Sequence, residues 1–143
     1  MNKNQRQFVL PVRVYYEDTD AAGLVYYANY LRFMERARTE WLRALGYEQS
    51  RLGADRVAFV ARSVSVDFLK PARLDDQLTV IAEIGALGRA QVTFAQRVER
   101  DGELLVTGQV RIACIDPERG RAAALPPQMY QEFLALMTPQ AGN

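Results

Sequence analysis

The order of the predicted secondary structure is the feature that most constrains the fold of this chain. One long apolar helix is followed by four strand-like segments, and no second helix separates those strands. Strands joined without crossover helices pair as antiparallel neighbours, because a parallel pair needs a connection of a dozen or more residues. An amphipathic helix must bury its apolar side against another layer. The order therefore predicts an α+β fold in which an antiparallel β-sheet wraps around one long central helix.

Alternating apolar residues give the boundaries of the predicted strands. The first strand is expected at 8–16, where Pro11 favours an edge position or a bulge. The later strands are expected at 57–69, 77–87, 90–100 and 103–116. Between the last two, "DG" alone favours a two-residue turn, whereas the apolar register requires Val98 opposite Val106. We therefore predict an odd-length connection or a bulge at this hairpin.

Two segments have the spacing of helices. The central helix is expected at 28–45, with Gly46 at a position typical of a helix C-terminus. Its apolar stripe contains Leu31, Phe33, Met34, Ala37, Trp41, Leu42 and Leu45. A short C-terminal helix is expected at 126–137, with Tyr130, Phe133, Leu134 and Met137 on its apolar side. Nothing marks a linker, so we expect a single domain over 1–143, with its core at about 8–137.

Composition argues against several classes of function. A net charge of +1 gives no field that would attract nucleic acid or an anionic membrane. The chain has no apolar run of the length a membrane span needs and no signal-peptide core, and its single cysteine agrees with a cytoplasmic location. It also contains no histidine, so the commonest general base is missing. An active site here must use another group.

The stretch DTDAAGLVYYANY, at residues 18–30, carries the candidate chemistry. Two acids in a loop more often shape a turn than react, and no further ligand follows at metal-binding spacing, so no metal is expected. The loop ends where the long helix begins, however, so N–H groups near Tyr27 lack intrahelical acceptors. Those donors suit a carbonyl oxygen that becomes negative during acyl transfer. A carboxylate beside them could attack the acyl carbon or activate a water.

A longer stretch of sequence resembles a known family. YYEDTDAAGLVYYANYLRFMERARTEWLRALG looks like the signature of hotdog-fold acyl-CoA thioesterases of the 4-hydroxybenzoyl-CoA thioesterase type. Together with RVAFVARSVSVDFLKPARLDD and ACIDPERGRAAALP, it is most similar to the Tol–Pal-associated members, from about residue 8 to about residue 136. The resemblance implies a hotdog fold, hydrolysis of an acyl-CoA or acyl-carrier-protein thioester without a cofactor, and a homodimer or homotetramer with active sites at the subunit interface.

The resemblance also implies roles for individual residues. Asp20 matches the catalytic carboxylate, as nucleophile or general base, and Tyr27 matches the position whose backbone N–H polarises the thioester carbonyl. Tol–Pal-associated members often have histidine where this chain has Tyr27, so the carboxylate and the amide remain as the chemical groups. Substrate contacts are expected from Tyr16, Gly23, Val25, Tyr26, Lys70, Gly88, Arg89 and Gln91.

Several assignments keep a simpler alternative. Arg89 and Lys70 suit coenzyme A phosphates, but a solvated hairpin cation is the slightly favoured alternative for both. Tyr16 can line an acyl pocket or pack in the core. Glu35 can assist catalysis, although exposure or a salt bridge to Arg38 is more typical, and Cys114 is expected to be buried packing.

Two other functions suit the same fold. A hydroxyacyl dehydratase typically relies on histidine, which this chain lacks. A non-catalytic acyl-CoA or acyl-carrier-protein binding or scaffold protein is the remaining alternative, although binding alone would not require the Asp20 carboxylate.

Overall fold

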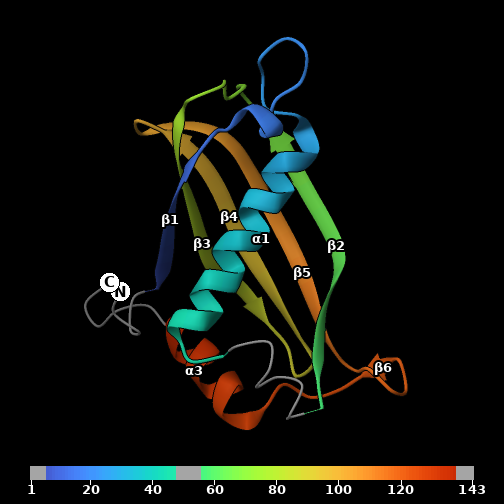
Figure 1. Cartoon of the computed structure of the whole chain (residues 1–143). Coiled ribbons are helices and arrows are strands. Elements are labelled where there is room, and N and C mark those ends of the chain that lie inside the picture. Colours follow the sequence, from blue (N-terminus) through green and yellow to red (C-terminus); the bar gives the residue numbers. More distant parts are fainter. Residues whose placement is uncertain (1–5, 48–55, 138–143) are drawn as a thin grey trace, which may run out of the picture.

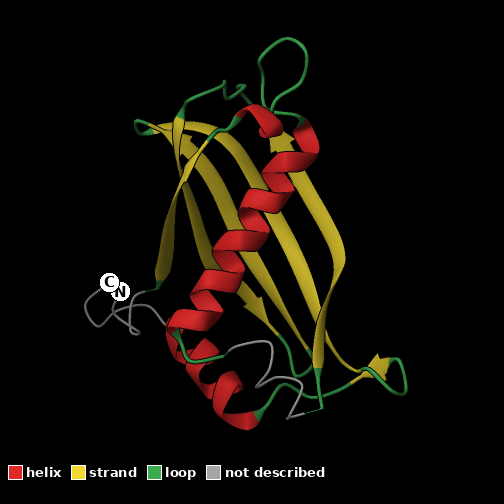
Figure 2. Ribbon diagram, viewed as in Figure 1, coloured by secondary structure: helices red, strands yellow, loops and turns green. Residues whose placement is uncertain are grey.

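A computed structural model describes residues 6–47 and 56–137 and shows a curved sheet that holds one long helix in its concave face (Figures 1 and 2). The chain order is β1 (Gln7–Arg13), the 3-10 turn η1 (Tyr16–Asp18), α1 (Tyr27–Ala44), β2 (Ala58–Phe68), β3 (Gln77–Leu87), β4 (Gln91–Arg100), β5 (Glu103–Asp116), β6 (Arg121–Ala122) and α3 (Pro127–Met137). The strands lie in the order β1-β3-β4-β5-β2, and β6 pairs with β5. The predicted α+β arrangement is confirmed.

The two edges of the sheet differ in how well they are covered. β1 pairs with β3 alone in the described sheet, and Pro11 lies within it, which confirms the predicted edge position. β1 ends at Arg13 rather than at residue 16, because the backbone N–H of Tyr15 donates to Asp18 Oδ2 at 2.9 Å and starts the η1 turn. β2 forms the other edge, and most of its side chains are exposed.

The β4–β5 hairpin has both the two-residue turn that Asp-Gly favours and the strand register that its apolar residues require. Val98 pairs with Val106 as the apolar register requires, and Asp101 and Gly102 form a two-residue turn with φ of 51° and 81°. A register shift between Val98 and Glu99 reconciles the two, which confirms the bulge. The extra residue on β5 is Leu105, whose carbonyl accepts the N–H groups that follow β2, at 2.8 Å from Leu69 and 3.1 Å from Lys70.

Helix α1 buries one side against the sheet and leaves another uncovered. Most of its predicted stripe is buried, and Gly46 follows with φ of 97°, as a C-terminal glycine should. Leu31, expected in that stripe, is instead 36% exposed. In α3 the buried residues are Met129, Phe133 and Leu136, so the predicted apolar side was wrong at Leu134, which is 43% exposed. Both helices carry more apolar residues than one face can hold, so only those that contact the rest of the fold are buried.

Candidate active site

Asp18 is a structural residue of the loop between β1 and α1. Its side chain is buried, with Oδ2 accepting the Tyr15 N–H at 2.9 Å and Oδ1 accepting Asn29 Nδ2–H at 2.9 Å. Its carbonyl accepts the N–H of Tyr26 at 2.9 Å. These bonds tie the strand end, the loop and the first turn of α1 together. Asp18 therefore sets the geometry of the loop, and both of its carboxylate oxygens are occupied.

Asp20 has a different environment two residues later. It is exposed, and its Oδ1 accepts the N–H groups of Ala22 at 2.9 Å and Leu24 at 3.2 Å. No bond to its Oδ2 occurs within residues 6–47 and 56–137. Gly23 completes the turn with φ of 79°, and no atom lies within 4 Å of the position a Cβ would take. Asp20 is thus both a turn residue and an exposed carboxylate with one oxygen that accepts no hydrogen bond from the described residues.

The first turn of α1 supplies backbone donors beside this carboxylate. Tyr26 is the N-cap residue and provides no side-chain cap. The first amide with an acceptor is that of Asn29, which donates to the Tyr26 carbonyl at 2.8 Å. The N–H groups of Tyr27 and Ala28 have no protein acceptor in the described parts of the chain. The positive end of the helix dipole therefore faces the pocket with free donors.

Asp20 and the start of α1 border a pocket of about 390 Å³. Of the expected site residues, it contains Asp20, Val25, Tyr26, Tyr27 and Lys70. Its other lining residues are Leu24, Tyr30, Phe68, Leu69 and Pro71, which sequence reasoning did not assign to the site. Gly23 belongs to the loop but is not a lining residue. The segment 68–71 begins at the last residue of β2, and only the pairing of that strand brings it to the helix.

Aromatic rings form one wall of this pocket. The Tyr27 ring lies 4.6 Å from that of Tyr26 and meets Phe68 edge-on at 6.3 Å between centroids. The neighbouring Tyr27 phenol raises the pKa of Tyr26 above its usual value, so this hydroxyl is neutral at physiological pH. Tyr30 is buried beneath them, and its Oη accepts the Ala72 N–H at 2.9 Å. The wall is therefore apolar with neutral polar tips.

Lys70 lies at the rim within a chain of ion pairs. Its Nζ contacts Glu103 Oε2 at 2.6 Å, and Arg100 bridges Glu103 and Asp76 at 2.9 and 2.7 Å. Hydrogen bonds from Lys70 and Arg100 hold the pKa of Glu103 below its usual value. The network contributes two cations and two anions, so Lys70 is positioned but not isolated as a positive charge.

Four expected substrate contacts lie away from the pocket. Tyr16 is 82% exposed, so it does not pack in the core, and it is not a lining residue of this pocket, so its contact with substrate stays a prediction. Gly88, Arg89 and Gln91 lie at the β3–β4 connection. β3 begins beside the loop that carries Asp20, and its length places Arg89 about 35 Å farther along the sheet. These three residues cannot reach Asp20 of the same chain.

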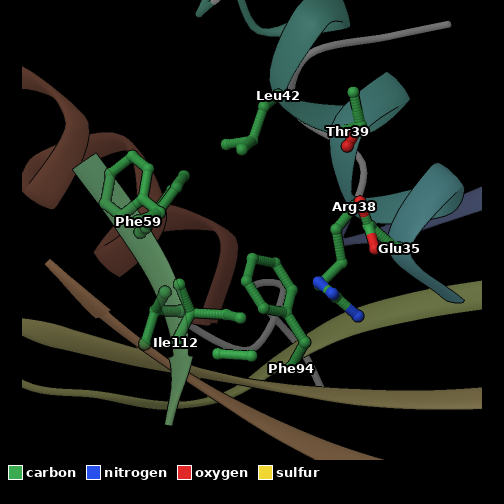
Figure 3. A pocket seen from close by; sticks show the side chains of 10 residues that line it. Glu35, Arg38, Thr39, Leu42, Phe59, Phe94 and Ile112 are labelled. Atoms are coloured by element: carbon green, nitrogen blue, oxygen red, sulfur yellow. The ribbon is translucent and has the colours of Figure 1, made fainter. Parts of the chain in front are cut away.

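A second cavity, of about 240 Å³, lies farther along α1 (Figure 3). Its lining residues are Glu35, Arg38, Thr39, Leu42, Phe59, Ala61, Val92, Phe94, Ile112 and Phe133. Arg38 Nη1 donates to Gln96 Oε1 at 2.9 Å, and burial lowers the pKa of its guanidinium. Glu35 is exposed, and no ion pair joins it to Arg38 in the described chain, so the exposure alternative is the one observed.

Three further features of the described residues bear on the sequence predictions. Cys114 is buried, and burial raises the pKa of its thiol, which confirms packing. The described residues contain no cluster of His, Cys, Asp and Glu able to hold a metal ion. They also include no helix that is long and apolar enough to cross a membrane.

Two known bacterial proteins are similar to this chain over most of its length. The acyl-CoA thioester hydrolase YbgC of Shigella flexneri is 47% identical over 131 residues, covering 91% of this chain and 98% of that protein. The acyl-CoA thioesterase YbgC of Haemophilus influenzae is 42% identical over 127 residues, covering 88% and 93%.

Solved structures show the same fold. A probable thioesterase from Bartonella henselae has a TM-score of 0.79 at 36% identity, covering 84% of this chain and 99% of that one. A 1,4-dihydroxy-2-naphthoyl-CoA thioesterase from Synechocystis has a TM-score of 0.85 at 25% identity, covering 93% and 99%. The fold is thus the hotdog fold of these thioesterases. The thioesterase-like superfamily matches residues 14–133, and the chain belongs to that superfamily.

Proposed function

We propose that this protein hydrolyses acyl-CoA thioesters to a carboxylic acid and free coenzyme A. The observation that carries the proposal is the pairing of one unoccupied Asp20 oxygen with free N–H donors at the start of α1, in one pocket. The likeness to acyl-CoA thioester hydrolases over nearly the whole chain supports the substrate class.

The proposed reaction places negative charge on the thioester oxygen, close to the start of α1. The thioester oxygen accepts a hydrogen bond from the Tyr27 N–H, and negative charge developing there is stabilised by the helix N-terminus. Asp20 then acts in one of two ways. It attacks the acyl carbon, releasing coenzyme A thiolate and leaving a mixed anhydride that water hydrolyses, or it takes a proton from a water that attacks the same carbon. In both routes the thiolate finally receives a proton from water or a protonated group.

The rest of the pocket suits binding rather than bond breaking. The Tyr26, Tyr27 and Phe68 rings form an apolar wall for the acyl group, and the raised pKa of Tyr26 keeps its phenol neutral. We assign Lys70 to the phosphates of coenzyme A, because its ammonium lies at the rim. Glu103 competes for that ammonium, so the contribution of Lys70 to binding is expected to be modest.

We further propose that active sites form between two copies of the chain. β2 presents an unpaired edge with exposed Val60 and Val64, which suits antiparallel pairing with a second β2 about a two-fold axis. Such a partner runs in the opposite direction, so its β3–β4 connection would approach Asp20. That places the expected contacts of Gly88, Arg89 and Gln91 in trans. A tetramer and a cytoplasmic location stay predictions.

Asp20→Asn tests the catalytic assignment. Asparagine retains the oxygen that accepts the Ala22 and Leu24 amides, so stability should be unchanged, while turnover falls at least ~100-fold. Free thiol is followed with a disulfide reagent over a panel of acyl-CoA thioesters. Tyr27→Phe is the matched control, because it keeps the backbone amide and should lose much less. Undiminished turnover in Asp20→Asn would remove Asp20 from the mechanism.

Two further measurements separate the alternatives. A single turnover in isotopically labelled water places label in Asp20 only if a mixed anhydride forms and water attacks its aspartyl side. Mixing inactive Asp20→Asn with weakened Arg89→Ala should restore activity if Arg89 acts in trans, because one site of the mixed dimer is then intact. If no acyl-CoA or acyl-carrier thioester is hydrolysed, a non-catalytic binding or scaffold role becomes the better explanation.

A further inference from the structure

The Asp20 pocket and the second cavity lie at opposite ends of one seam between α1 and β2. The two elements run antiparallel (Figure 1), since Phe68 at the end of β2 meets Tyr27 at the start of α1. At the other end, Phe59 near the start of β2 shares the second cavity with Leu42 near the end of α1. α1 and β2 therefore border both the Asp20 pocket and the second cavity.

The seam between these ends is uncovered, and its side chains are apolar apart from those of Glu35 and Arg38 on α1. On β2, Val64 and Phe68 pair with Val110 and Val106, whose buried side chains show that this is the helix-facing side. Val64 and Phe68 are nevertheless 45% and 50% exposed. On α1, residues 27, 31, 35, 38 and 42 follow one another at spacings of three and four and so share a face. Leu31 lies on that uncovered face and is 36% exposed, although the sequence pattern placed it in the core.

Arg38 is the cation at the far end of the seam. Its Nη1 donates a hydrogen bond to Gln96 Oε1, and the Gln96 Nε2–H in turn donates to the Met34 carbonyl at 3.0 Å. No carboxylate lies within ion-pair distance of Arg38 in the part of the chain described, and apolar side chains such as Leu42 and Phe94 share its cavity (Figure 3). A guanidinium has five N–H donors, so most of them are left for another partner. Arg38 is half-buried, and Glu35 in the same cavity partly offsets the effect of burial on its pKa without forming an ion pair. An oxygen acceptor on a ligand would therefore still gain a charge-assisted hydrogen bond from the guanidinium.

We propose that the second cavity receives the far end of the acyl chain and that Arg38 selects chains carrying an oxygen acceptor there, a carboxylate or a hydroxyl. This inference rests on the proposed function. Eleven residues separate Tyr27 from Arg38 on α1, a distance of about 17 Å along the helix axis. That separation corresponds to a medium-chain acyl group rather than a short one.

The test compares three thioesters of one length: dodecanoyl-CoA, ω-hydroxydodecanoyl-CoA and the ω-carboxy analogue. In the wild type, kcat/KM should be higher for at least one oxygen-terminated chain than for dodecanoyl-CoA. Arg38→Met keeps the apolar stem and should lower that kcat/KM by about tenfold or more, the value of one charge-assisted hydrogen bond. It should leave dodecanoyl-CoA within about twofold. Arg32→Met, at an exposed arginine of the same helix, is the control and should change none of the three.

The outcomes distinguish the possible errors. Loss confined to the hydroxy chain or to the carboxy chain identifies which acceptor the cavity takes. Equal kcat/KM for all three chains in the wild type would overturn the role of Arg38 while leaving thioester hydrolysis intact. A uniform loss with all three in Arg38→Met, together with a lower melting temperature, would show that Arg38 only cross-links α1 to β4 through Gln96. Absence of hydrolysis with every thioester would overturn the proposed function as well.

Discussion

Removing the Asp18 carboxylate should destabilise the protein. Asp18→Ala takes away two hydrogen bonds of 2.9 Å, from the Tyr15 N–H and from Asn29 Nδ2–H. Bonds to a charged group are worth about 1.5–3 kcal/mol each, which gives a ceiling of about 3–6 kcal/mol. The bond from the Tyr15 N–H is only partly buried, whereas the bond from Asn29 is buried and Asn29 is 8% exposed. We therefore expect the free energy of unfolding to fall by about 3 kcal/mol, the lower end of this range.

Urea unfolding followed by circular dichroism measures this loss. Glu17→Ala removes the same charge from an exposed neighbour and should change stability by less than about 0.5 kcal/mol. A double-mutant cycle with Asn29→Ala should give a coupling of about 1–2 kcal/mol. An Asp18→Ala protein within about 1 kcal/mol of wild type, or no coupling to Asn29, would refute the claim that Asp18 anchors the loop.

Three other perturbations have expected outcomes. Tyr30→Phe leaves the buried Ala72 N–H without its 2.9 Å acceptor and should cost about 1–3 kcal/mol in urea unfolding. Gly108→Val should cost about 1–3 kcal/mol, because a Cβ there lies 3.1 Å from Met34 Cε, and Met34→Ala should recover part of the loss. Asp76 has a lowered pKa: burial raises it, but hydrogen bonds from the Arg100 side chain and the Arg73 amide outweigh burial. Its stabilising contribution is therefore complete above the usual aspartate pKa and lost as the pH falls through the lowered value, so unfolding curves of wild type and Asp76→Asn should converge in acid.

Local sequence pattern determined the elements and part of the site. The β4–β5 register followed from which residues are apolar, because a slip of one position would turn Val98 and Val106 away from the core. The loop-and-helix signature likewise brought Asp20 and Tyr27 to one pocket. These features depend on residues near one another in the chain or on a strict twofold alternation, so they can be read without knowing the fold.

The sequence did not reveal which apolar surfaces the fold leaves open. Leu31 and Leu134 have the spacing of core residues, yet both are exposed because the sheet covers only part of each helix. Phe68 joined the pocket because β2 runs antiparallel to α1, and Arg89 was carried away from Asp20 by the length of β3. Distances between segments far apart in the chain are set by strand order and direction. Those are properties of the closed tertiary structure, and no local periodicity encodes them.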